Sequence, residues 1–110
     1  MLFRSLDGVN GPDLAVANND SNDVSVLLNH GDGTFATPVS YAAGDEPESV
    51  AIGDLDGAEG PDLAVANYGS DDVSVLLNVG DGTFADAAAC AAGGQPYSVA
   101  VGDQIGRAHV

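Results

Sequence analysis

Basic side chains are nearly absent from this sequence of 110 residues, in which Lys and Arg together number 2 against 17 Asp and Glu. The formal net charge is −15. A nucleic-acid-binding protein needs Lys and Arg to contact phosphates, and anionic membrane surfaces attract basic segments for the same reason. We therefore expect no nucleic-acid partner and no anionic membrane partner, whereas divalent cations should be attracted.

Cysteine, long apolar runs and aromatic residues are also scarce. The single cysteine, Cys90, excludes an internal disulfide. No apolar run approaches the roughly 18 residues of a membrane-spanning helix, so we expect no membrane insertion, and we find no signal peptide in this chain. Tryptophan is absent, which leaves Tyr41, Tyr68 and Tyr97 as the only candidates for stacking against a sugar.

The two ends differ from the rest of the chain. Residues 2–5 (LFRS) and 105–110 (IGRAHV) resemble the translated ends of a sequencing adapter, and they contain both arginines. We expect residues 1–5 and 105–110 to be non-native tails, which are excluded from reasoning about the fold.

A 49-residue repeat fills the remainder. Residues 6–54 align with residues 55–103 without a gap, and 34 of the 49 aligned pairs are identical. We therefore divide the chain into repeat units 6–54 and 55–104. Periods of 20 to 50 residues are typical of solenoids, propellers and other arrays, whose units cannot bury their apolar faces alone.

Each unit predicts four short strands. In the second unit and its flanks we expect strands at 49–53, 62–67, 73–78 and 83–91, and the first strand of a further blade at 97–102. Alternating apolar residues, many of them β-branched, dominate these segments, and no helical period is present. Four strands in 49 residues is the size of a propeller blade. We predict an all-β fold of four-stranded antiparallel β-propeller blades.

Three motifs carry a resemblance to a known family. The segments GDLDG (53–57), PDLAVAN (61–67) and GDGTF (80–84) resemble the FG-GAP/VCBS-type repeat, the blade of integrin α-chain-like β-propellers and of many secreted bacterial proteins. The resemblance implies that the first strand is innermost and that the acidic loop after it binds Ca²⁺. It also implies a non-enzymatic adhesion or scaffold protein that is secreted or at the cell surface.

The acidic loop supplies suitable calcium ligands. Ca²⁺ takes six to eight oxygen ligands, often from alternate positions of a curled loop. Asp54, Asp56 and Asp62 occupy positions 1, 3 and 9, and the carbonyl of Gly60 occupies position 7. Position 5, usually Asp or Asn in the family, is Ala58, so a water molecule would replace one ligand. We expect weak affinity, with Kd about 10⁻⁴–10⁻³ M.

The first copy of this loop is incomplete. It contains Asp7, Gly11 and Asp13, but the residue that matches Asp54 is Ser5, within the expected tail. A complete site would need Asp103 from another copy of the chain. The alternative for all these aspartates is that they cap turns by accepting backbone N–H bonds.

Two blades cannot close a propeller, since propellers have 4 to 8 blades. We expect residues 97–102 of one copy to pair with residues 13–18 of the next, so that the ring is completed by homo-oligomerisation. The result is a homotrimer or a homotetramer, of which we favour the tetramer.

No catalytic set is evident, because neither His30 nor His109 recurs in the repeat, and we expect no enzyme activity. Two alternatives remain. One is a carbohydrate-binding module with pockets between its blades, and the other is the non-catalytic part of a polysaccharide-acting enzyme. A carbohydrate or protein ligand is therefore left open.

Overall fold

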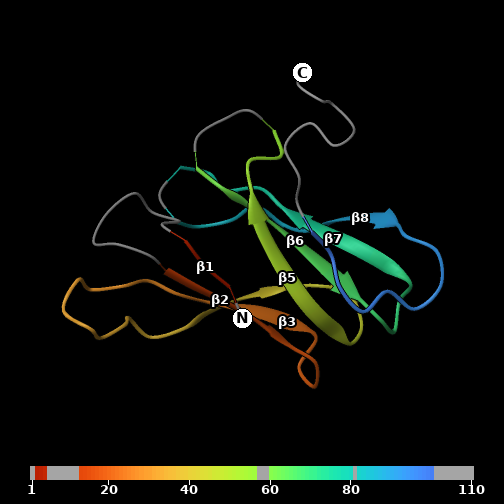
Figure 1. Ribbon diagram of the computed structural model, residues 1–110, viewed down its shortest axis with the longest axis horizontal. Coiled ribbons are helices and arrows are strands. Elements are labelled where there is room, and N and C mark those ends of the chain that lie inside the picture. The colour runs from red at the N-terminus through yellow and green to blue at the C-terminus, as the bar shows by residue number, and fades with distance from the viewer. Residues whose placement is uncertain (1, 5–12, 57–59, 81, 101–110) are drawn as a thin grey trace.

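The computed structural model describes residues 2–4, 13–56, 60–80 and 82–100, and it arranges them in two four-stranded antiparallel sheets (Figure 1). Each sheet follows the order of the chain. The first sheet contains β1 (Leu2–Arg4), β2 (Asp13–Asn18), β3 (Asp23–Leu27) and β4 (Val39–Ala42). The second contains β5 (Pro47–Gly53), β6 (Asp62–Asn67), β7 (Asp72–Leu76) and β8 (Ala88–Ala91). The predicted all-β fold of four-stranded antiparallel blades is confirmed.

Identical sequence produces identical local structure in the two sheets. β2 and β6 both read DLAVAN, and β3 and β7 both read DVSVL. At the turn after β6, Asn67 Nδ2 donates to Asp72 Oδ1 and to Ser74 Oγ, both at 2.8 Å. Asn18 makes the equivalent bonds in the first sheet. These side-chain bonds close each hairpin and set its register. In the described part of the chain, no helix is long and apolar enough to span a membrane.

Some strand limits differ from those predicted. The third strand of the second sheet ends at Leu76 rather than at residue 78, because Asn78 holds the following GDG turn by accepting a hydrogen bond from Gly80 N at 2.8 Å. The fourth strand begins at Ala88 rather than at residue 83. Before it, an isolated bridge between Asn78 and Phe84 replaces a continuous ladder.

The first strand of the first sheet comes from an unexpected source. β1 pairs Leu2 with Ala15, Phe3 with Leu14 and Arg4 with Asp13, which is the register of β5 on β6 moved by one repeat. Residues that we expected to be a tail thus occupy part of the edge that we assigned to residues 97–102 of another copy. Tyr97–Ala100 forms no strand in the described chain, and residues 101–102 lie outside the described part.

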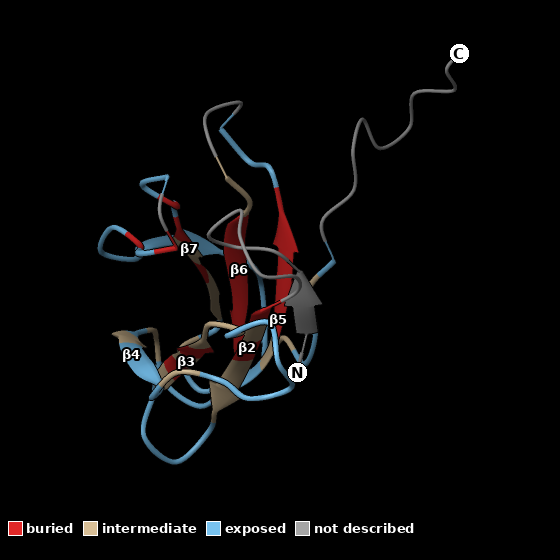
Figure 2. Cartoon of the chain, turned by 90° about the vertical axis from the view of Figure 1, so that its left-hand side faces the viewer, coloured by how far each residue is buried: buried red, intermediate tan, exposed pale blue. Residues whose placement is uncertain are grey.

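Each sheet has two apolar faces. One, here called the Leu face, carries Leu14, Val16 and Leu27 in the first sheet and Leu63, Val65 and Leu76 in the second. The opposite one, the Val face, carries Val24 and Val26 in the first sheet and Val73 and Val75 in the second. The Val face of the first sheet packs against the Leu face of the second to form the core. Figure 2 shows the buried residues concentrated in β5 and β6, at this contact.

The connection between the sheets, residues 43–46, is hydrogen-bonded to the turn after β6 in the second sheet. Tyr68 N donates to Glu46 O at 2.9 Å, and Gly69 N donates to Asp45 O at 3.0 Å. Gly44 N donates to Asn67 Oδ1 at 3.2 Å. A Cβ at Gly44 would lie 2.5 Å from Ser70 Oγ, so this approach requires glycine. The connection therefore fixes the position of the second sheet on the first.

Candidate metal centre

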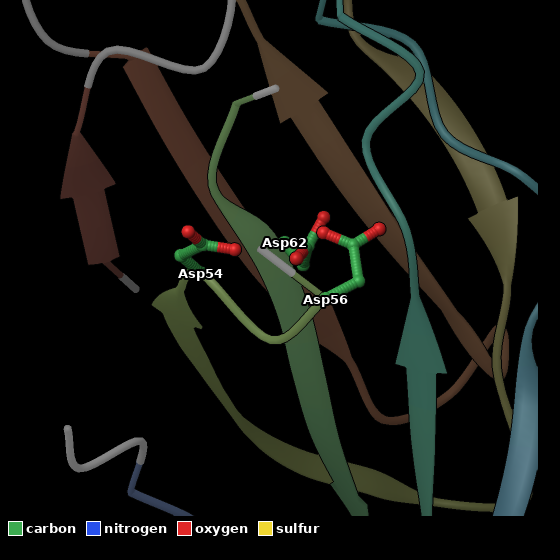
Figure 3. Close-up of side chains that lie close together, drawn as sticks. All are labelled: Asp54, Asp56 and Asp62. Atoms are coloured by element: carbon green, nitrogen blue, oxygen red, sulfur yellow. The ribbon is translucent and has the colours of Figure 1, made fainter. Parts of the chain in front are cut away.

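Three carboxylates meet where β5 ends and β6 begins. One oxygen from each of Asp54, Asp56 and Asp62 lies within 4.8 Å of the other two. Figure 3 shows Asp62, at the start of β6, between the side chains of Asp54 and Asp56. Asp62 is fully buried, whereas Asp54 and Asp56 are exposed. The cluster thus has one rigid ligand and two that face solvent.

Asp62 is held in place through both of its carboxylate oxygens. Oδ2 accepts a hydrogen bond from Leu55 N and Oδ1 accepts one from Asn78 N, each at 2.8 Å. These bonds are those of the turn-capping alternative. They do not exclude a metal, since each carboxylate oxygen has two lone pairs and can accept a second partner. The same bonds pre-orient the carboxylate for a cation.

Gly60 is required by the backbone of the loop. Its φ is 80°, a left-handed conformation that glycine adopts without strain. A Cβ at this position would lie 2.7 Å from Asn78 Nδ2, and that atom donates to Pro61 O at 2.9 Å. Coordination by the Gly60 carbonyl stays a prediction, and Ala58 lies outside the described residues.

The charge and chemistry of the cluster fit a hard cation. Three carboxylates within 4.8 Å repel one another, and the sequence has no Lys or Arg between Arg4 and Arg107. A divalent cation would offset this repulsion. The donor set is oxygen only, which suits Ca²⁺ or Mg²⁺ rather than the metals that prefer nitrogen or sulfur.

In the first copy of the loop, the structure describes one of the predicted ligands. Asp13 is fully buried, and its Oδ1 accepts a hydrogen bond from Asn29 N at 2.8 Å. This is the contact that Asp62 makes with Asn78. Asp7, Gly11 and Asp103 lie outside the described residues, so the incomplete site and its completion by another copy stay predictions.

The remaining acidic and nucleophilic candidates have structural explanations. Asp32 lies in a GDG turn, where its Oδ1 accepts bonds from Thr34 Oγ1 at 2.6 Å and from Thr34 N at 3.0 Å. These bonds hold the pKa of Asp32 below its ordinary value. Cys90 is exposed on β8, and His30 is exposed in the first GDG turn. Asp32 is thus a turn residue, as its position in the motif indicates.

The three tyrosines have different environments. Tyr41 packs edge-on against Phe84 in the core, with ring centroids 5.4 Å apart. The rings of Tyr68 and Tyr97 contact each other at 4.7 Å. A hydrogen bond that the Tyr68 hydroxyl donates to Tyr97 raises the pKa of Tyr68, and the nearby charges of Glu46 and Glu48 act in the same direction.

Contact between these two tyrosines was not predicted, although the repeat contains a signal for it. Asn19 matches Tyr68 and Glu48 matches Tyr97, and Asn19 Nδ2 donates to Glu48 Oε2 at 2.6 Å. Both members of a contacting pair are therefore replaced together in the second unit. Such coupled mismatches indicate contact between the positions.

One cavity lies between the two sheets at their outer strands, with a volume of about 370 Å³. It is lined by Ser40, Tyr41, Ala42, Ala43, Leu76, Ala85, Asp86 and Ala87. Half of the lining residues are alanines, and Leu76 is also apolar. Polar groups that could orient a ligand are therefore few.

Comparison with known proteins supports the repeat assignment. Residues 6–57 match the family model of the FG-GAP-like repeat, whose members are typically non-catalytic structural repeats of β-propeller-type domains. Neither the curated proteins nor the solved structures gave a match. The matched segment runs from the first unit through β5 into the acidic loop, and the second unit repeats the first at 34 of 49 positions. The chain therefore carries an FG-GAP-like repeat over residues 6–57 and a second copy of that repeat, and the two fold as two blade-like sheets.

Proposed function

We propose that the loop from Asp54 to Asp62 binds Ca²⁺ and that the chain is a non-catalytic, calcium-stabilised β-propeller module. The supporting observation is the convergence of three carboxylate oxygens within 4.8 Å around the fully buried Asp62. Asp54 and Asp56 follow β5 directly, and Asp62 begins β6. A bound ion would therefore tie the innermost strand of the blade to its neighbour.

The geometry favours calcium over magnesium. Mg²⁺ demands near-ideal octahedral coordination, whereas Ca²⁺ accepts six to eight oxygens in flexible geometry. Asp54 and Asp56 are exposed, so water has access to the coordination positions that the loop leaves open. A site with few charged ligands and several waters binds weakly, in the range of about 10⁻⁴–10⁻³ M.

Such an affinity suits an extracellular protein, because extracellular modules bind calcium in this range. We therefore propose that the chain derives from a secreted or cell-surface protein with an adhesion or scaffold role. The strongly acidic composition, with a net charge of −15, agrees with a calcium-rich environment in which cations screen the surface.

The test is thermal unfolding in CaCl₂, in MgCl₂ and in EDTA. Binding to the folded state alone stabilises it by about 1.4 kcal/mol when the free ion is tenfold above Kd. We expect the melting temperature to rise by several degrees in 10 mM CaCl₂ and less in MgCl₂. Isothermal titration calorimetry on the same protein would give the affinity and the number of ions.

Two variants and one control separate specific binding from general screening. Asp54→Asn and Asp56→Asn change exposed ligands and should abolish the calcium-dependent rise. Asp32→Asn removes the same charge from the first GDG turn, at an exposed position that is not part of the cluster, and should preserve it. Equal melting temperatures in calcium and EDTA for the unaltered chain would refute the proposal, as would an undiminished rise in both ligand variants.

No specific observation in the described part of the chain favours the carbohydrate-binding alternative. Tyr68 and Tyr97 are the surface tyrosines, but their rings pack on each other. They also stand where Asn19 and Glu48 form a hydrogen bond in the first unit. Packing between neighbouring elements therefore explains the tyrosine pair, and we do not propose a sugar ligand for it.

A further inference from the structure

The two repeats bury the same residues to different extents. Leu63, Val65 and Leu76, on the Leu face of the second sheet, are each 0% exposed. Their counterparts in the first sheet, at 14, 16 and 27, are half-buried. Because the residue types and the strand register are the same, the difference comes from the neighbouring sheet. Among the described residues, no sheet covers the Leu face of the first sheet in the way that the first sheet covers the Leu face of the second.

The Val faces show the opposite difference. Val24 and Val26 of the first sheet are 0% and 2% exposed. Val73 and Val75 of the second sheet are half-buried. In the described part of the chain, the Val face of the second sheet is therefore incompletely covered. The described residues thus leave two faces incompletely covered, here called open: the Leu face of the first sheet and the Val face of the second.

These open faces are complementary, because the covered contact within the chain is built from the same residues. Inside the chain, Val24 and Val26 share one core with Leu63, Val65 and Leu76. Val73 and Val75 of one copy could pack in the same way on Leu14, Val16 and Leu27 of another. A second copy of the chain therefore presents a Leu face that is complementary to the open Val face.

The segment that follows the second sheet has the same local structure as the connection between the two sheets. In both repeats it begins in the same way: Ala43 N donates to Asn22 O, and Ala92 N donates to Asp71 O. Gly44 then approaches the turn of the following sheet, whereas added Cβ atoms at Gly93 and Gly94 would meet nothing within 4 Å. Residues 92–95 thus have the form of the connection between sheets, with open space where the next turn would lie.

The segment after this connection lies where the innermost strand of a further blade would begin. Val99 N donates to Ser49 Oγ of β5 at 3.2 Å. Tyr97 contacts Tyr68, in the way that Glu48 of β5 contacts Asn19. Tyr97 is 66% exposed. The repeat thus continues in space beyond the second sheet, and a further sheet at this position would cover its Val face.

The edge of β2 has room for this segment. β5 pairs along β6 from Asp62 to Asn67, whereas β1 pairs along β2 from Asp13 to Ala15. Moved by one repeat, the register of β5 on β6 matches residues 96–99 with residues 16–18. These residues lie beyond the reach of β1, so both strands can share the edge of β2.

We propose that the chain assembles head to tail with copies of itself, with the Val face of the second sheet against the Leu face of the first sheet of the next copy. Residues 96–99 then pair with residues 16–18 of that copy. This contact does not depend on the calcium site. Head-to-tail contacts form closed rings when the rotation per step fits, and propellers have 4 to 8 blades. Six or eight blades correspond to a homotrimer or a homotetramer.

The test uses two variants that each disable one face. Val75→Asp places a charge on the open Val face, and Leu27→Asp places one on the open Leu face. Both positions are half-buried, and circular dichroism would check that each variant is folded. Light scattering after size exclusion would give the mass. We expect a trimer or tetramer from the unaltered chain and a monomer from each variant, since an unpaired charge in an apolar contact weakens association by about 100-fold or more.

Mixing the variants makes the test specific. Val75→Asp retains its Leu face and Leu27→Asp retains its Val face, so the mixture should form a one-to-one heterodimer that cannot grow. Val79→Asp is the matched control, because Val79 is an exposed valine, 62% accessible, in the GDG turn. It should leave the assembly unchanged. Val75→Ser and Leu27→Ser serve in the same design if either charged variant fails to fold.

A gain in affinity can also be measured. Within the chain, Tyr41 packs on Phe84, which is 8% exposed. The equivalent contact between copies joins Cys90 to Phe35, which is 36% exposed. Cys90→Tyr should restore the aromatic pair and tighten association by about 2- to 10-fold.

Three results would overturn the proposal. The first is a folded monomer of the unaltered chain at millimolar concentration, which would mean that another occupant, such as a further repeat, covers these faces. The second is assembly of both Asp variants to the same mass as the unaltered chain, which would place the contact elsewhere. The third is a mixture of folded, monomeric variants that forms no heterodimer.

Discussion

Leu76→Ala and Leu27→Ala are a matched pair of substitutions that measures what the contact between the sheets contributes to stability. The two leucines end identical strands, DVSVL, and pair in the same register with Leu63 and Leu14. Local strand propensity is therefore the same at both positions. Leu76 is 0% exposed, whereas Leu27 is half-buried. A difference in cost between the two substitutions reports on tertiary packing.

The expected magnitudes follow from burial. Leu76 lies in the core cluster between the sheets, and truncation of such a leucine costs about 2–5 kcal/mol, including the cavity left behind. Full burial of a leucine contributes about 1.5–3 kcal/mol, so the half-buried Leu27 should cost about 1 kcal/mol. We expect the free energy of unfolding to fall by about 1–4 kcal/mol more for Leu76→Ala than for Leu27→Ala.

The assay is urea unfolding followed by circular dichroism, at a protein concentration low enough to keep the chain monomeric. Equal losses for the two variants would refute the reasoning, because they would mean that the Leu face of the first sheet is covered within a single chain. A second series at high protein concentration adds a further check. If the open Leu face binds another copy, the cost of Leu27→Ala should then rise toward that of Leu76→Ala.

Two further predictions concern the loops. Gly60→Ala should lower the free energy of unfolding by about 1–2 kcal/mol or more, because the φ of Gly60 is positive. Gly33→Ala should lower it less, because Gly33 has a similar φ of 91° but nothing lies within 4 Å of an added Cβ. Chemical denaturation measures both losses, and equal losses would show that the contact of the added Cβ at Gly60 with Asn78 does not destabilise the fold. Tyr97→Phe should lower the pKa of Tyr68 in an ultraviolet titration, because the hydrogen bond that Tyr68 donates to Tyr97 is the main cause of its elevation. Since the folded state holds this proton more tightly, the contribution of Tyr68 to stability is present below pH 10 and is lost as the pH rises through its folded-state pKa. An unchanged titration in the variant would contradict this assignment.

Apart from β1, the strand order and pairing could be read from the sequence because each repeat specifies them locally. Alternation in DLAVAN and DVSVL selects strands, and the side chains of Asn67 and Asp72 close the turn between them. Strand limits were less predictable. The third strand stops at Leu76 because Asn78 uses its side chain in the GDG turn, and that competition appears only in three dimensions.

The candidate site was predictable to a similar degree. Alternate aspartates after a strand indicate a curled loop that points them inward, and the structure brings Asp54, Asp56 and Asp62 together. The sequence did not indicate that Asp62 is the buried member, nor that Leu55 N and Asn78 N hold its carboxylate. Those bonds join residues from three separate segments.

By itself, the sequence determined the 49-residue unit, its antiparallel strands and the position of its acidic loop, because each depends on contacts between residues close in the chain. Tertiary structure decided which of two identical residues is buried. Leu27 and Leu76 have the same neighbours in sequence, yet Leu76 is covered by the preceding sheet and Leu27 is not. Burial depends on what lies across a face, and in a repeat protein that neighbour comes from another unit.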